Sequence, residues 1–248
     1  MNAMDDRPRT AGEETPEMAS PDAPRVTHAM EDYLKAIYRL QSDGGQVTMQ
    51  RLTEELDLSG PSVTNMVKRL HELELVRHTR YRDVALTSAG EKVALRVIRH
   101  HRLLELYLTE SLGYEWDQVH AEAERLEHHV SKELEARIAS ALGHPTRDPH
   151  GDPIPSADGA IDSVSSQVLA DLEPGDVATI TRVPDRDPEQ LRYLGELGVV
   201  PGQTIAVLEK LPFDGPIRVR IGTDEHLFGL PLAARINVAP RRNEVRHE

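Results

Sequence analysis

The sequence contains no cysteine among its 248 residues, and this absence excludes several classes of protein at once. Disulfide-stapled folds, thiolate zinc fingers and iron–sulfur clusters all need cysteine. No segment approaches the roughly 18 consecutive apolar residues of a membrane span. The N-terminal residues Met-Asn-Ala-Met-Asp-Asp lack an apolar signal core. We therefore expect a cytoplasmic protein that does not cross a membrane.

The sequence also lacks the positive net charge of a typical nucleic-acid-binding protein, since its formal net charge is −13. The distribution of charge corrects this impression. Between Ser59 and Arg102, nine Lys and Arg residues stand against four acidic residues. Because local potential rather than total charge governs a DNA contact, this segment is able to face DNA.

Three short helices are expected near the N-terminus. The first begins after Thr27, a suitable N-cap, and ends at the turn 42–45. The second covers about 48–56, and the third opens with Pro61. Residues 75–87 have two β-prone ends around a basic, aromatic tip, which is typical of a hairpin. Together these elements predict a winged helix-turn-helix.

The third helix would enter the major groove of DNA, and the hairpin would contact the backbone or the minor groove. Hydroxyl and amide side chains reach base edges, whereas Lys and Arg more often hold phosphates. For any one residue, a solvated surface is the simpler interpretation, but the combination favours DNA binding. The candidate DNA-binding residues are Ser59, Pro61, Ser62, Thr64, Asn65, Lys68, Arg69, Arg80 and Arg82.

Carboxylates and imidazoles recur at i, i+3 and i+4 spacing on two further predicted helices, at about 88–112 and 116–142. On a helical wheel, those of the second helix border its apolar face. A single such His is more often a satisfied core residue, but the joint occurrence favours a metal site. With no thiolate available, Mn²⁺, Fe²⁺, Co²⁺ or Zn²⁺ would suit it, and hard oxygen ligands favour Mn²⁺. The residues are His101, Glu105, His120, Glu124, Glu127 and His128.

After residue 172 the pattern changes to short β-prone runs between turns, with one short helix at 188–197. This predicts a small β-barrel, so the fold class is mainly α with a small β domain. The patterns divide the chain into a disordered tail (1–24), a winged helix-turn-helix domain (25–90), a helical domain (91–144), a proline-containing linker (145–171), the β domain (172–240) and a tail (241–248).

Seven short motifs, in order over about residues 26–240, are typical of one known family. They are Met30-Glu-Asp-Tyr-Leu-Lys-Ala-Ile-Tyr38, Ser59-Gly-Pro-Ser-Val63, Leu86-Thr-Ser-Ala-Gly90, His101-Arg-Leu-Leu-Glu105, Val119-His-Ala-Glu-Ala123, Glu127-His128 and Gly151-Asp-Pro-Ile-Pro155. By these motifs the chain resembles the diphtheria-toxin-repressor family of metal-dependent transcriptional repressors. The C-terminal segment resembles the SH3-like domain that this family shares with a ferrous-iron-transport accessory protein.

The resemblance implies a homodimer that binds a pseudo-palindromic DNA operator when loaded with Fe²⁺ or Mn²⁺ and represses metal-uptake genes. It implies that residues 91–144 serve dimerisation and metal binding. It places a primary metal site on Asp32, Glu124, Glu127 and His128. It places an ancillary site on His101, Glu105 and His120, with Asp187 and Gln190 from the SH3-like domain.

Three residues of this chain, Asp32, Glu124 and Lys35, stand at positions that differ between members of the family it resembles. The iron-sensing members carry Met and Cys where this chain has Asp32 and Glu124, and the manganese-sensing members carry Asp and Glu. Mn²⁺ is therefore the expected cofactor, with Fe²⁺ as the alternative. Manganese regulators without a third domain have a ligand Glu where this chain has Lys35. Because a cation cannot ligate a metal, we expect two separated sites rather than that two-metal cluster.

We hypothesise that a metal ties the first helix to the dimerisation helix through Asp32 and so fixes the DNA-reading domain. Two other classes remain open. A metal-dependent hydrolase with Glu127 as base would need a substrate cleft, and the sequence has no HExxH motif, so we do not expect an enzyme. A DNA-binding regulator that responds to an organic ligand would leave the His/Glu stripe solvated.

Overall fold

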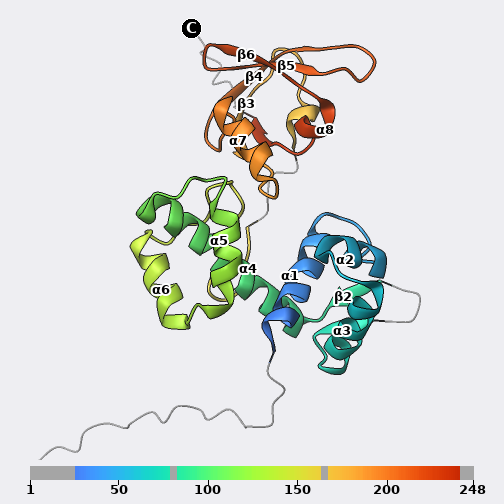
Figure 1. The fold of residues 1–248 in the computed structure, drawn as a ribbon. Helices are drawn as coiled ribbons and strands as arrows, with labels where there is room; N and C mark the ends of the chain where they lie inside the picture. The colour runs from blue at the N-terminus through green and yellow to red at the C-terminus, as the bar shows by residue number, and fades with distance from the viewer. Residues whose placement is uncertain (1–25, 79–82, 163–166, 241–248) are drawn as a thin grey trace, which may run out of the picture.

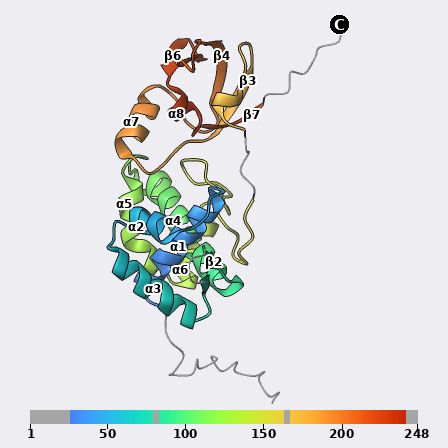
Figure 2. The ribbon, with the colours of Figure 1, turned by 90° about the vertical axis from the view of Figure 1, so that its right-hand side faces the viewer.

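The computed structural model describes residues 26–78, 83–162 and 167–240. Figure 1 shows two helical units and, beyond them, a β unit formed by the C-terminal third of the chain. Figure 2 shows the same β unit stacked on the helical units in the perpendicular view. None of the described helices combines the length and the apolar character that crossing a membrane requires.

The first unit is the predicted winged helix-turn-helix. Its helices begin at capping residues, because the hydroxyls of Thr27 and Thr48 accept hydrogen bonds from backbone N–H groups of the first turn. The apolar faces of the helices meet in one core that includes Leu34, Leu52 and Val67. The two wing strands pair antiparallel. The elements are α1 (His28–Ser42), α2 (Met49–Leu56), α3 (Gly60–Glu72), β1 (Val76–His78) and β2 (Val84–Leu86).

The second unit corrects one prediction. The expected helix at 116–142 is broken into α5 (Val119–Leu126), a 3₁₀ turn η1 (Glu127–His129) and α6 (Lys132–Ala141), all packed around α4 (Ser88–Leu112). The physical reason is a new helix start, since the Ser131 hydroxyl accepts from the Leu134 N–H and caps α6. Trp116 precedes α5 and packs against the core of the β unit.

The β unit is a five-stranded antiparallel sheet in the order β6-β5-β4-β3-β7. Alternating inward side chains such as Ile180, Ile205 and Val219 form its core with Leu191 of α7 and Phe228. The strand β7 and the short helix α8 were not predicted, because four-residue elements carry little periodic signal. The elements are η2 (Leu169–Asp171), β3 (Val177–Arg182), α7 (Pro188–Glu196), β4 (Thr204–Lys210), β5 (Ile217–Ile221), β6 (Asp224–Phe228), α8 (Leu230–Ala233) and β7 (Asn237–Pro240).

The first part of the predicted linker is packed rather than loose. Arg147 and Pro153 form a β-bridge, and the turn between them buries Asp148, His150 and Asp152. Gly151, at φ +92°, sits in this turn where an added Cβ would lie 2.0 Å from the Thr181 carbonyl oxygen. This segment therefore docks against β3 and carries polar side chains into the region between α4 and the β unit.

Candidate metal centre and DNA interface

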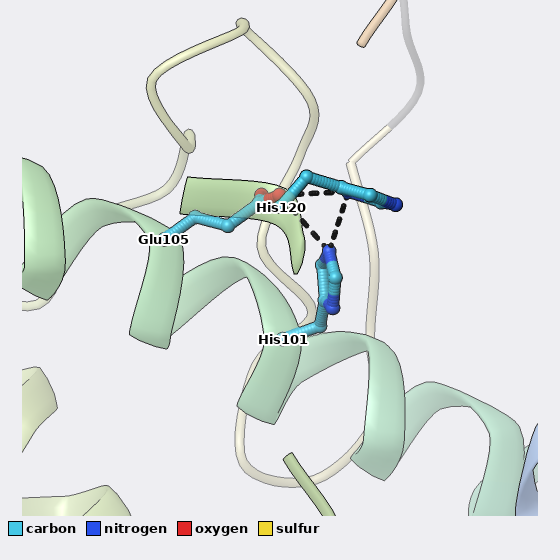
Figure 3. A group of neighbouring side chains, drawn as sticks. All are labelled: His101, Glu105 and His120. Atoms are coloured by element: carbon cyan, nitrogen blue, oxygen red, sulfur yellow. Dashed lines mark hydrogen bonds and ion pairs between the residues drawn. The ribbon is translucent and has the colours of Figure 1, made fainter. Parts of the chain in front are cut away.

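A buried cluster joins α4 to α5. His101 and Glu105 lie one turn apart on α4, and His120 of α5 reaches across to them (Figure 3). Glu105 Oε1 lies 2.9 Å from His101 Nε2 and 3.1 Å from His120 Nδ1. One ligand atom from each residue fits within 4.8 Å of the others, which is a spacing suited to a metal ion. The predicted ancillary residues of the helical domain therefore meet in space.

Burial and charge act in opposite directions in this cluster. Burial alone would lower the pKa of His101, but the Glu105 carboxylate and a hydrogen bond to Glu127 outweigh it and raise that pKa to about 9. Burial alone would raise the pKa of Glu105, yet His101 and His120 hold it well below its usual value. In the metal-free protein the two α4 side chains therefore form a buried ion pair.

This ion pair predicts a pH dependence of stability in the metal-free protein. Because the folded-state pKa of His101 is raised, the ion pair stabilises fully below about pH 6.5, the unfolded His value. We expect the free energy of unfolding to fall as pH rises from there through about 9, the folded-state pKa. Urea melts in EDTA will show this slope. The slope should become clearly shallower in His101→Gln and stay unchanged in His226→Gln, a control substitution on β6. A flat wild-type profile would contradict the ion pair.

Two residues beside this cluster, Asp148 and His150, were not among the predicted ligands. Glu105 Oε2, His150 Nδ1 and Asp148 Oδ2 are buried and have no hydrogen-bond partner among the described residues. His150 Nε2 lies 2.8 Å from the Trp116 carbonyl and donates to it, while its Nδ1 lies 3.8 Å from Glu105. Glu105, Asp148 and His150 bring one potential ligand atom each within 4.8 Å of the others, a spacing that fits a bound cation. The sequence did contain a signal for these ligands, the stretch Asp148-Pro-His150, but it was assigned to the linker 145–171.

The β unit contributes Asp185 to the same region. Burial and the Glu105 charge would raise the pKa of Asp185, but Arg39, His150 and His120 together lower it. The predicted Asp187 has another role, since its carboxylate accepts from the N–H groups of Glu189 and Gln190 and caps α7. In the described part of the chain, Asp187 makes no hydrogen bond or ion pair with the His101 cluster. The Gln190 Oε1 atom is buried without a hydrogen-bond partner there.

A second cluster joins α1 to η1. His128 Nε2 lies 2.8 Å from Asp32 Oδ1 and 3.5 Å from Glu127 Oε1, and these three groups again fit within 4.8 Å. Burial raises the pKa of Asp32 in spite of His128 and Lys35. A cavity of about 410 Å³ lined by Asp32, Lys35 and Glu124 lies against this cluster. Three of the four predicted primary residues therefore come together directly.

Glu124 is held beside the cluster by Lys35. The Lys35 ammonium lies 2.8 Å from Glu124 Oε1 and 2.5 Å from Glu127 Oε1, and it is almost fully buried. Burial would raise the pKa of Glu124, but Lys35 lowers it to about 2. Glu127 also accepts from His101 Nδ1 at 2.6 Å, so the two clusters share a wall. Residue 35 supplies a cation here and no ligand oxygen.

The predicted DNA-reading face of α3 is open to solvent. The residues from Ser59 to Arg69 that were singled out are exposed, except for Thr64, which is half-buried and donates to the Gly60 carbonyl. Val63, Val67 and Leu70 face the core instead. Arg80 and Arg82 lie outside the described residues. The helix therefore presents the hydroxyl, amide and basic groups that the sequence analysis assigned to DNA.

An exposed recognition helix, a wing and buried His/carboxylate clusters define a metal-dependent DNA-binding regulator. The chain matches the iron dependent repressor N-terminal DNA binding domain over residues 25–84 and the iron dependent repressor metal binding and dimerisation domain over 87–156. It matches the FeoA domain over 167–240. The chain belongs to the iron-dependent repressor family, whose members include the diphtheria toxin repressor.

The similar proteins named here are all regulators. The iron-dependent repressor IdeR of Mycobacterium tuberculosis is 34% identical over 189 residues, covering 71% of this chain and 82% of that protein. A manganese-dependent transcriptional repressor solved in complex with manganese is 40% identical with a TM-score of 0.80, covering 86% of this chain and 100% of that one. The manganese regulator SloR is 29% identical with a TM-score of 0.72, covering 86% and 98%. None of these supports the hydrolase alternative.

Proposed function

We propose that this protein is a Mn²⁺-dependent repressor of metal-uptake genes that acts in the cytoplasm. The observation that carries the proposal is the donor set around His128, where Asp32 and Glu127 supply carboxylates, Glu124 lies beside them, and the chain has no cysteine to supply a thiolate. Hard oxygen ligands with imidazole favour Mn²⁺, and Fe²⁺ is the second candidate. The 40% identical structural relative, which holds manganese, supports the same choice.

Two sets of residues would hold the metal. The primary set is Asp32, Glu124, Glu127 and His128. The ancillary set is His101, Glu105 and His120, and we extend it to Asp148, His150 and Asp185, whose buried acceptors or charges face the same region. A bound divalent cation would add positive charge beside these carboxylates.

The chain's own contacts explain how such a site would control DNA binding. Asp32 is on α1 of the DNA-reading unit, and His128 is on η1 of the helical unit, so a metal held by both residues would link the unit that carries α3 to the helical unit. Exposed apolar side chains of the helical unit, Leu112, Tyr114, Leu126 and Leu134, would be covered in a homodimer. Two copies of α3 would then match the half-sites of a pseudo-palindromic operator.

A metal titration of DNA binding tests this function. DNA fragments are first selected from a random double-stranded library by the protein with Mn²⁺, and binding is then followed by fluorescence anisotropy. We expect Mn²⁺ to raise affinity by about 10- to 100-fold, with Fe²⁺ weaker and EDTA abolishing the effect. If the same DNA fragments were enriched equally with and without metal, the result would contradict the proposal. It would favour a regulator that responds to another ligand.

A further inference from the structure

Glu31 lies next to the primary cluster but was not among its predicted residues. It sits on α1, is 8% exposed, and has both carboxylate oxygens engaged. Oε2 lies 2.7 Å from His128 Nδ1, and Oε1 lies 2.7 Å from Arg96 Nη2 of α4. The carboxylate thus joins three elements, α1, α4 and η1. The other ring nitrogen of His128, Nε2, faces Asp32 and Glu127.

We infer that Glu31 is a positioning residue that selects which nitrogen of His128 carries the proton and which one faces the metal. The inference rests on the proposed metal site. A carboxylate oxygen only accepts hydrogen bonds, so the contact with Glu31 requires an N–H at Nδ1. A neutral imidazole has only one N–H, so Nε2 then keeps its lone pair. That lone pair is directed to Asp32 and Glu127, where a metal ligand is needed.

Asp32 makes this selection necessary. Its Oδ1 lies 2.8 Å from His128 Nε2 and, as an acceptor, favours a proton on that nitrogen. Such a proton would block ligation through Nε2. Glu31 and Asp32 therefore compete for the single proton of the ring, and the tautomer follows the stronger acceptor.

Two neighbours hold Glu31 and His128 in this arrangement. Arg96 can only donate, so it keeps one oxygen of Glu31 occupied and the other turned to His128. The His28 ring stacks on the His128 ring at a centroid distance of 4.8 Å and an angle of 10°. The stacking restrains the plane of the ring while Glu31 determines its tautomer.

The variant Glu31→Gln tests the inference because an amide has one accepting atom where the carboxylate has two. Arg96 can only donate, so it binds the amide oxygen and the NH₂ group is left facing His128 Nδ1. Because the NH₂ group also donates, Nδ1 must accept, and the ring proton moves to Nε2. We expect the affinity for Mn²⁺, measured from the EPR signal of free Mn²⁺, to fall about 10- to 100-fold. The ¹⁵N NMR spectrum of the metal-free protein at pH 8.5 should show the His128 proton moving from Nδ1 to Nε2.

The double variant Arg96→Met/Glu31→Gln separates tautomer selection from a merely structural role. Without Arg96 the amide oxygen is free to accept from Nδ1–H, so most of the lost Mn²⁺ affinity and the Nδ1–H tautomer should return. A structural role predicts that the double variant is at least as weak as Glu31→Gln alone. The control Glu209→Gln removes an Arg-paired carboxylate of the β unit, whose oxygen lies 3.2 Å from Arg218, and should change neither readout.

The outcomes distinguish this inference from the proposed function. Wild-type protein that binds Mn²⁺, together with Glu31→Gln of equal affinity and unchanged tautomer, overturns the inference alone. Wild-type protein that binds no Mn²⁺ overturns the proposed function. In that case the NMR measurement still decides on tautomer selection, because it uses metal-free protein.

Discussion

The variant Asp32→Ala will lose metal-dependent DNA binding. Asp32 is the α1 carboxylate that lies 2.8 Å from His128 Nε2, so its removal takes away the ligand by which a bound metal would link the DNA-reading unit to η1. We expect the affinity for a selected operator at saturating Mn²⁺ to fall about 100-fold, to near the affinity in EDTA. Fluorescence anisotropy against the same DNA fragment measures the loss.

The matched control for this experiment is Asp43→Ala. Asp43 follows α1 at its C-terminal end and is exposed, so its removal changes the charge by the same amount without touching the cluster. It should keep operator affinity within about twofold, as expected of a surface substitution. Wild-type operator affinity in Asp32→Ala would show that orientation of the DNA-reading unit does not pass through Asp32.

The variant Lys35→Met will destabilise the metal-free protein by about 3 kcal/mol, the usual cost of removing one partner from a buried ion pair. The Lys35 ammonium contacts Glu124 and Glu127, and Glu127 is fully buried. Without Lys35 the Glu127 charge stays buried with less compensation. Urea denaturation in EDTA at pH 7 measures the change in the free energy of unfolding.

Saturating Mn²⁺ should recover more stability in Lys35→Met than in the wild type, since Glu124 and Glu127 are then free to hold a cation. The control Lys210→Met removes a surface lysine paired with the exposed Glu173 and should cost less than about 1 kcal/mol. If Lys35→Met were as stable as this control, the buried ion pair would contribute little to the metal-free fold.

Local patterns were enough to predict most of the fold. The caps at Thr27 and Thr48, the apolar spacing of α1 and α3, and the alternation in β3 to β6 involve residues within one turn or one strand of each other. The prediction that a single helix spans 116–142 was wrong because Ser131, followed by acidic residues in the first turn of α6, starts a new helix there. That start signal was present in the sequence and was outweighed by the apolar periodicity on both sides.

The sequence by itself determined the chemistry of this protein: no thiolate, a basic helix-turn-helix segment, and carboxylates and imidazoles at helical spacing. Only the tertiary structure decided which of those groups meet. The break at η1 turns Glu127 and His128 towards α1, and the packed turn at 147–153 brings His150 to Glu105. Lys35 and Glu31 take their roles from partners about 90 residues away, on elements whose relative positions no local periodicity encodes. Side-chain spacing is local, whereas a metal site depends on the packing of separate helices.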